Sequence, residues 1–236
     1  MSASPSVRAV TFDFGQTLAD LDTELLAARL AERAVVADAA RLEAAGPAAW
    51  HAYSRAIQAG AGGHPWKLLM RELLGGAGVE PAAIAPAVDW LWTEQPTRNL
   101  WRRPVPGMIA LVDALAAAGL AVAVVSNSEG RLAELAAELG WERKFAVIAD
   151  SGKLGLEKPD PRIFAWTCER LGVAAAETIH VGDAWAADIE GARAAGLSAV
   201  WFRGEGAPSD PRVRVAADAP ATRRALRSLG APLDPA

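Results

Sequence analysis

The chain has 236 residues, of which 52% are hydrophobic, and its formal net charge is −4. Acidic and basic residues are interspersed, which argues against a nucleic-acid-binding protein because such proteins usually carry a basic face. No stretch approaches the roughly 20 uninterrupted apolar residues of a membrane-spanning helix, and the first residues lack the basic and apolar regions of a signal peptide. We therefore expect a cytoplasmic protein that acts on neither nucleic acid nor membrane.

The first third of the chain predicts one strand followed by a helical segment. Residues 7–12 form a short β-rich run that stops at Asp13. From about 20 to 103, Ala-, Leu-, Arg- and Glu-rich stretches have helical periodicity. They are interrupted at Gly46-Pro47, at 60–65, at 75–81 and at Pro96. We predict four or five helices and no strand in this segment.

The pattern changes to alternating strands and helices at residue 104. Helical segments separate apolar runs at 120–126, 145–150, 178–183 and 198–202. Such alternation indicates right-handed βαβ units and a parallel sheet. We predict an α/β fold with a Rossmann-like core at 1–19 and 104–236 and an all-helical insertion at 20–103. The tail from about 205 is Pro-rich and polar, and one helix is predicted near 219–230.

The single cysteine, Cys168, lies in the helical segment PRIFAWTCERLG. One cysteine excludes an intrachain disulfide and a cysteine-rich metal site. Free cysteine behaves as a small buried hydrophobe, so we expect Cys168 to pack in the core.

Polar side chains stand at the expected strand ends, where α/β proteins bind ligands. Asp13 can attack a phosphorus atom, which splits one difficult displacement into two easier steps, and its carboxylate can also hold Mg²⁺. Ser126-Asn127 ends a second strand and offers a hydroxyl and backbone N–H groups to phosphoryl oxygens. Lys158, in a loop stiffened by Pro159, would offset negative charge.

Two further carboxylates follow the strand at 178–183. Asp183 ends it, and Asp188 lies at the start of the next helix. An acidic group near a helix N-terminus is stabilised by the helix dipole, which is the structural explanation for Asp188. Carboxylates that converge with Asp13 would repel one another, and a divalent cation resolves that repulsion.

Together these segments resemble the haloacid dehalogenase (HAD) superfamily, most of whose members are Mg²⁺-dependent phosphatases. The family reads D-x-D-G-T-[LV] where this chain has D-F-G-Q-T-L, and the strings KPDPRIF and GDAWAADIEGARAAGL match its lysine and acidic motifs. The resemblance implies that Asp13 is the nucleophile and that Thr17, Ser126, Asn127 and Lys158 bind the phosphoryl group. It also implies a Mg²⁺ site formed by Asp13, the Gly15 carbonyl, Asp183 and Asp188. Asp188 is expected to bind the ion directly, through water, or to orient Lys158.

The same resemblance places an insertion directly after the first motif in the position of the family's type-1 cap. It implies a small phosphorylated metabolite as substrate, without identifying it, and leaves the oligomeric state unspecified. The acidic motif argues against a true haloacid dehalogenase, which needs no metal and usually carries serine and asparagine there.

Gly15 departs from the family pattern. Its carbonyl can still bind a metal, but it lacks the carboxyl that protonates the leaving oxygen and then activates water, a contribution typically of about 10²–10⁴-fold. The family's turn glycine corresponds to Gln16, so a structural interpretation is that Gly15 relieves a backbone conformation that Gln16 makes costly. A good leaving group, or a proton donor such as His51 or His64 in the helical segment, would then be required.

Two alternatives stay open. Lys67 is the one lysine of the helical segment, and phosphonoacetaldehyde hydrolases, relatives that also lack the second aspartate, use such a lysine for a Schiff base in C–P hydrolysis. A weakly active or non-catalytic phosphate-binding protein is the other. The remaining polar and aromatic residues of the segment are interpreted as surface or packing residues rather than a substrate box: Tyr53, Arg55, Trp66, Arg98, Trp101 and Arg102.

Overall fold

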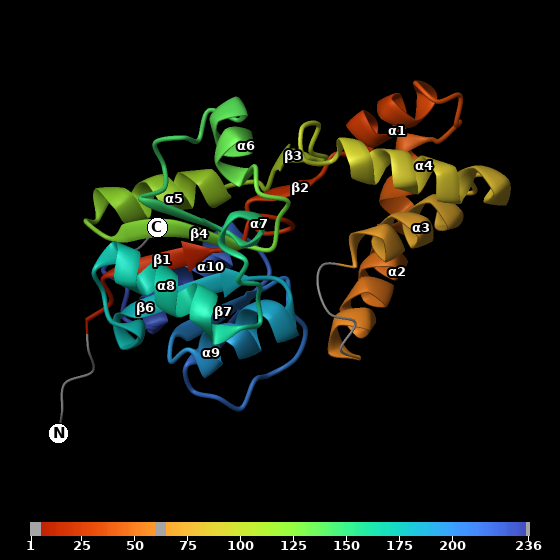
Figure 1. Ribbon diagram of the computed structural model, residues 1–236. Coiled ribbons are helices and arrows are strands. Elements are labelled where there is room, and N and C mark those ends of the chain that lie inside the picture. Colours follow the sequence, from red (N-terminus) through yellow and green to blue (C-terminus); the bar gives the residue numbers. More distant parts are fainter. Residues whose placement is uncertain (1–5, 60–64, 235–236) are drawn as a thin grey trace. The chain divides into compact units, whose positions relative to one another are not determined.

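The computed structural model describes residues 6–59 and 65–234, and Figure 1 labels the elements. The chain divides into two compact units, one formed by residues 1–20 and 103–236 and the other by residues 21–102. His64, considered above as a proton donor, lies outside the described residues. Within the described ranges, no helix combines the length and apolar character needed to cross a membrane.

The first unit contains a six-stranded sheet in the order β5-β4-β1-β6-β7-β8. All five neighbouring pairs run parallel, which confirms the predicted α/β fold. The strands are β1 (Ala9–Phe12), β4 (Ala121–Ser126), β5 (Val147–Asp150), β6 (Thr178–Gly182), β7 (Ser198–Phe202) and β8 (Val213–Ala216). β8 was not expected in the polar tail; the short alternating run VRVA becomes a strand because β7 supplies hydrogen-bonding partners for its backbone.

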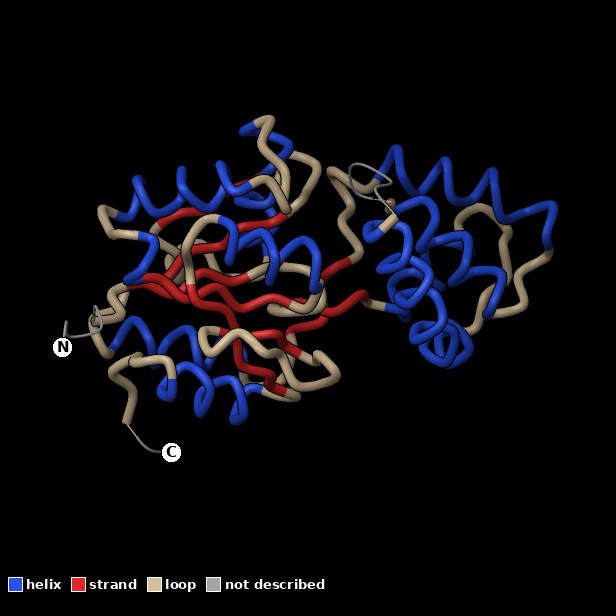
Figure 2. The backbone as a smooth tube through the Cα atoms, turned by 90° about the horizontal axis from the view of Figure 1, so that it is seen from below, coloured by secondary structure: helices blue, strands red, loops and turns tan. Residues whose placement is uncertain are grey.

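Helices cover both faces of this sheet (Figure 2). They are α5 (Met108–Ala117), α6 (Leu132–Glu138), α7 (Ser151–Leu154), α8 (Pro161–Leu171), α9 (Gly191–Ala194) and α10 (Ala219–Ser228). A 3₁₀ turn at Ala175–Glu177 precedes β6. The segment after β6, expected to be one helix, is instead a π-helical turn at Trp185–Glu190 followed by the short α9.

The core lies between the sheet and its helices. All four residues of β1 and all five of β6 are buried, as expected for central strands covered on both faces. Cys168 is buried in a cluster with Val125, Ile163 and Phe164, which confirms the prediction that it packs in the core.

The second unit is mainly helical in its described residues. It contains α1 (Thr23–Ala31), α2 (Ala39–Gln58), α3 (Trp66–Gly76) and α4 (Pro81–Glu94). The predicted break at Gly46-Pro47 was wrong, because α2 continues through Pro47. A proline inside a helix costs about 3 kcal/mol. Close packing against α3 offsets that loss: a β-carbon added at Gly76 would lie 2.9 Å from the Ala45 side chain.

The prediction that residues 20–103 contain no strand was also wrong at both ends. β2 (Ala19–Leu21) and β3 (Trp101–Pro104) form a two-stranded sheet where the chain passes between the units. Asp22 N–H donates to the Leu100 carbonyl at 2.9 Å beside this pair. Each segment is too short to predict alone, because its extended conformation depends on a partner about 80 residues away.

Candidate active site

Parallel register brings Asp13 to the edge of the sheet where β4 and β6 end. Phe12, the last residue of β1, is paired with Val124 on one side and Val181 on the other. The Asp13 backbone N–H donates to the Val181 carbonyl at 2.8 Å, which fixes the first residue after the strand. Asp13 is therefore held at the centre of the sheet, between two strands that end beside it.

Two donors meet on one oxygen of this carboxylate. Ser126 Oγ donates to Asp13 Oδ1 at 3.0 Å, and Lys158 Nζ donates to the same oxygen at 2.6 Å. The Lys158 side chain is 3% exposed and that of Asp13 is 11% exposed. Because both donors use Oδ1, the other oxygen, Oδ2, is the one left to approach a phosphorus atom or a cation.

Lys158 also binds Asp188. Its Nζ donates to Asp188 Oδ1 at 2.5 Å, and the Ala184 backbone N–H donates to Oδ2 at 2.9 Å. Asp188 thus contacts Lys158 directly, as it would have to do in order to orient the lysine, and that role stays a prediction. We call the following group of residues the strand-end site: Asp13, Ser126, Lys158, Asp183 and Asp188.

His180 is a member of this network that sequence reasoning missed. It is fully buried in β6, and its Nε2 lies 3.2 Å from Asp188 Oδ1. Its Nδ1 lies 2.9 Å from the Thr11 hydroxyl, which is directly opposite in the register of β1 and β6. Burial lowers the pKa of His180 and favours the neutral ring. A histidine inside an apolar strand next to the acidic motif was the signal that could have identified it.

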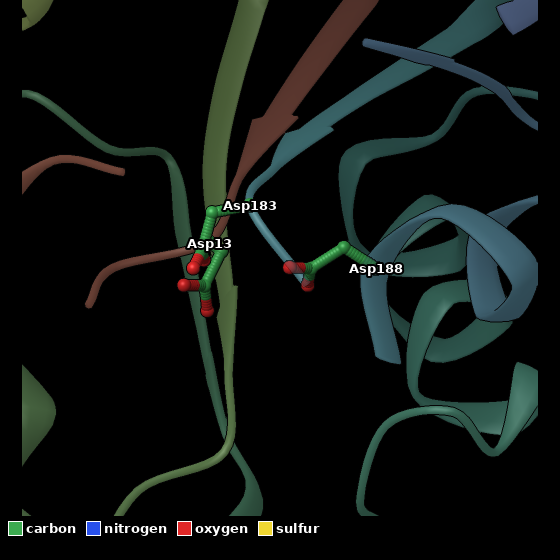
Figure 3. Close-up of side chains that lie close together, drawn as sticks. All are labelled: Asp13, Asp183 and Asp188. Atoms are coloured by element: carbon green, nitrogen blue, oxygen red, sulfur yellow. The ribbon is translucent and has the colours of Figure 1, made fainter. Parts of the chain in front are cut away.

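Among the residues that the structure describes, three carboxylates converge here beside a single ammonium group. Asp13, Asp183 and Asp188 each offer a carboxylate oxygen, and these atoms all lie within 4.8 Å of one another (Figure 3). Burial raises the pKa of Asp183 well above its usual range, and the carboxylates of Asp13 and Asp188 raise it further. Burial likewise raises the pKa of Asp13, against the opposing charge of Lys158.

The Lys158 ammonium has the opposite electrostatic surroundings. Burial alone would lower the pKa of Lys158, but the carboxylates of Asp13 and Asp188 outweigh burial and raise it. Burial alone would raise the pKa of Asp188, yet Lys158 and His180 hold it below its usual value. One ammonium against three carboxylates leaves an excess of negative charge on hard oxygen ligands. That donor set fits a Mg²⁺ ion, which prefers carboxylate, carbonyl and water oxygens.

The loop after Asp13 shows the consequence of the unusual D-F-G-Q-T-L string. Gln16 adopts the left-handed region with φ of 58°, so the positive φ falls on Gln16 and not on Gly15. Gly15 forms an isolated bridge with Ala19. Thr17 is fully buried, and its hydroxyl has no hydrogen-bond partner among the described residues.

The side-chain amide of Asn127 is used within the protein. It donates to the Lys158 carbonyl at 3.0 Å and accepts from the Lys158 backbone N–H at 2.8 Å. This two-way contact ties the strand end at Ser126 to the loop that carries Lys158. The side chain of Asn127 therefore contacts the lysine loop, and binding of a phosphoryl group by Asn127 stays a prediction.

The candidates of the helical unit are mostly engaged in their own unit. Lys67 Nζ forms an ion pair with Asp89 at 2.7 Å. His51 is exposed on α2. Arg55 is also exposed on α2. Five other candidates contact neighbours within the unit: Arg98 with Glu32, Arg102 with Asn99, Trp101 and Tyr53 with Trp50, and Trp66 with Trp92.

Comparison with known proteins identifies the family. A family profile described as haloacid dehalogenase-like hydrolase matches residues 7–196. The chain belongs to this family. Haloacid dehalogenase-like hydrolase domain-containing protein 3 of Bos taurus is 33% identical over 153 residues, which are 64% of this chain and 60% of that protein. The chain thus matches less than two thirds of that relative's length.

Two further similarities extend over more of this HAD hydrolase. The glyceraldehyde 3-phosphate phosphatase of Methanopyrus kandleri is 30% identical over 203 residues, which are 84% of each chain. The crystal structure of the putative HAD-hydrolase YfnB from Bacillus subtilis, bound to magnesium, superposes with a TM-score of 0.66 at 19% identity. That match covers 95% of this chain and 99% of the other, and at this identity it supports the fold alone.

Proposed function

We propose that this HAD hydrolase is a Mg²⁺-dependent phosphatase of a small phosphorylated metabolite and acts through an aspartyl-phosphate on Asp13. The observation that carries the proposal is the pair of donors on Asp13 Oδ1, Lys158 Nζ at 2.6 Å and Ser126 Oγ at 3.0 Å, beside two further carboxylates. The relative named glyceraldehyde 3-phosphate phosphatase supports a phosphorylated substrate.

In the first step, Asp13 Oδ2 attacks phosphorus, a P–O bond forms, and the bond to the leaving oxygen breaks. Ser126 and Lys158 hold the attacking carboxylate in place. The Lys158 ammonium keeps a third N–H for a phosphoryl oxygen, whereas the single O–H of Ser126 would have to turn from Asp13 to donate to one. Asp13, Asp183, Asp188 and the Gly15 carbonyl would hold Mg²⁺, which supplies charge neutralisation for the phosphoryl group. Phosphoryl transfer needs chiefly such positioning and charge stabilisation.

Gly15 restricts which substrates this arrangement serves. With no carboxyl at position 15, nothing in the D-F-G-Q-T-L loop protonates the leaving oxygen. Substrates whose leaving group departs as a stable anion, such as acyl phosphates and aryl phosphates, need no proton and suit the site. In the second step, water attacks phosphorus and the Asp13 carboxylate leaves. That water lacks the usual base, so the aspartyl-phosphate should turn over slowly.

The test is phosphate release from p-nitrophenyl phosphate and acetyl phosphate, with Mg²⁺ or with EDTA, by wild type and by Asp13→Asn. Turnover that requires the metal and is lost in Asp13→Asn supports the proposal. Background rates for both proteins would reject it.

Gly15 also favours a second candidate function, a phosphate-binding HAD protein with little or no turnover. Mg²⁺ together with inorganic phosphate would then raise the melting temperature of the wild type while phosphate release stays at background. C–P hydrolysis through Lys67 has no such support, because its amine is paired with Asp89. Borohydride trapping of an aldehyde substrate on Lys67 would be the evidence needed to support C–P hydrolysis.

A further inference from the structure

Asp150 is a buried carboxylate next to the strand-end site that the proposed chemistry does not use. It ends β5, pairs in register with Ser126 at the end of β4, and is 2% exposed. A charged group in such a place is costly unless hydrogen bonds satisfy it. The groups that donate hydrogen bonds to Asp150 therefore indicate which segments this carboxylate holds in place.

The Asp150 carboxylate binds the loop that follows Ser126-Asn127. Oδ1 accepts from the Ser128 hydroxyl at 2.7 Å and from the Gly130 N–H at 3.1 Å. Oδ2 accepts from the N–H of Leu132, the first residue of α6, at 2.9 Å. Asp150 also caps α7 through the Gly152 N–H at 3.0 Å. One carboxylate thus fixes both helix starts and the loop between β4 and α6.

Two neighbours of Asp150 strengthen this attachment. Ser151 Oγ accepts from the Ser128 backbone N–H at 3.0 Å and donates to the Ser128 carbonyl at 3.2 Å. A β-carbon at Gly152 would lie 2.5 Å from the Gly130 nitrogen, so only glycine allows the two segments to approach this closely. The backbone from Ser128 to Leu132 is held from one side by residues 150–152.

The held loop leads directly to the catalytic lysine. Asn127 immediately precedes Ser128, and its amide binds the Lys158 backbone in both directions, at 3.0 and 2.8 Å. Lys158 Nζ in turn lies 2.6 Å from Asp13 Oδ1. An unbroken series of contacts therefore runs from the Asp150 carboxylate through Ser128 and Asn127 to the ammonium on the nucleophile.

We propose that Asp150 is a positioning residue that sets Lys158 against Asp13 through the Ser128–Asn127 segment. The proposal rests on the function proposed above for the same site. It has a physical basis in pre-organisation: a displacement of about 1 Å at a reacting group, caused by a change outside the chemistry, can reduce the rate by about 10²-fold. Ser126 itself is held by β4 and depends less on Asp150.

The variant Asp150→Asn separates positioning from folding. Its amide oxygen can keep the donors on Oδ1, but its NH₂ group faces the Leu132 N–H, so the loop loses an anchor while the core keeps its volume. We expect kcat/KM for acetyl phosphate to fall by up to about 10²-fold. Asp218→Asn is the matched control, because Asp218 is an exposed N-cap of α10 in the same unit, bound to the Ala221 N–H at 2.7 Å. We expect it to leave kcat/KM unchanged.

A double-mutant cycle with Asn127→Ala tests the route. If Asp150 acts through Asn127, adding Asp150→Asn to Asn127→Ala changes kcat/KM by no more than about twofold, the scatter of independent measurements. Effects that multiply fully in the double variant would overturn the proposal. So would an Asp150→Asn enzyme as active as wild type.

Hydrogen exchange gives a readout that needs no turnover. The Lys158 amide donates to Asn127 Oδ1, so Asp150→Asn should increase its exchange rate by about tenfold or more, while Asp218→Asn should not. Unchanged exchange at Lys158 in Asp150→Asn would overturn the proposal. If Lys158 exchanges faster in Asp150→Asn but the wild type releases no phosphate, the positioning role is supported and the phosphatase function is rejected. Failure of the positioning proposal and failure of the phosphatase proposal can therefore be told apart.

Discussion

The variant Gly15→Asp asks whether one missing carboxyl limits this enzyme to substrates with good leaving groups. The position is half-buried in the loop after Asp13, and the positive φ of that loop belongs to Gln16 at 58°. An aspartate at position 15 therefore meets no left-handed backbone penalty. General acid–base help is worth about 10²–10⁴-fold, or about 3–5 kcal/mol of activation free energy.

The expected gain depends on the leaving group. For an alkyl phosphate, whose leaving oxygen needs a proton, kcat/KM should rise by about 10²-fold or more in Gly15→Asp. For acetyl phosphate the first step should change little, because acetate leaves without a proton. Gln16→Gly, added to the same variant, should raise stability by about 1 kcal/mol by removing the left-handed strain.

The assay is phosphate release from both substrates at saturating Mg²⁺, with Gly15→Asn as the control of equal size that cannot act as an acid. A Gly15→Asp protein that folds and binds Mg²⁺ but accelerates the alkyl phosphate no more than Gly15→Asn would refute this reasoning. The limit on turnover would then lie elsewhere than at position 15.

Three further predictions concern charge and metal. Lys158→Met leaves the buried carboxylates of Asp13 and Asp188 unpaired, so the free energy of unfolding from urea titration should fall by about 3–5 kcal/mol, and a loss below about 1 kcal/mol would contradict the ion-pair geometry. The raised pKa values of Asp13 and Asp183 mean that these two carboxyl groups bind protons more tightly in the metal-free folded protein than in the unfolded chain. The stability that this protonation contributes is present at low pH and is lost as the pH rises above the ordinary carboxyl range. The rise in melting temperature caused by Mg²⁺ should consequently be larger at about pH 7.5 than at about pH 5, and a rise independent of pH would argue against these ligands. Trp201→Phe removes the indole N–H that donates to the Asp183 carbonyl at 2.8 Å. The Mg²⁺ concentration that gives half-maximal activity should then increase by about tenfold. An unchanged Mg²⁺ titration would exclude a role of Trp201 in holding Asp183.

The fold class was predictable because the decisive patterns are local. Apolar runs that alternate with helical segments, together with polar residues at each strand end, indicated a parallel sheet with a site at its carboxyl edge. Errors arose where the conformation depends on distant partners. β2, β3 and β8 are extended because other strands pair with them, and α2 continues through Pro47 because α3 packs against it.

For the strand-end site, the sequence by itself determined which chemical groups are present: the carboxylates, one lysine, one serine, and the glycine where the family has an acid. Only the tertiary structure decided which of these groups form hydrogen bonds and ion pairs with one another. In the folded protein Lys158 lies between Asp13 and Asp188, and the side-chain amide of Asn127 binds the backbone of Lys158. His180 contacts Asp188, and Asp150 binds the loop next to the site. The reason is that hydrogen-bond partners and burial depend on distances between residues far apart in the chain, and these distances exist only once the sheet has formed.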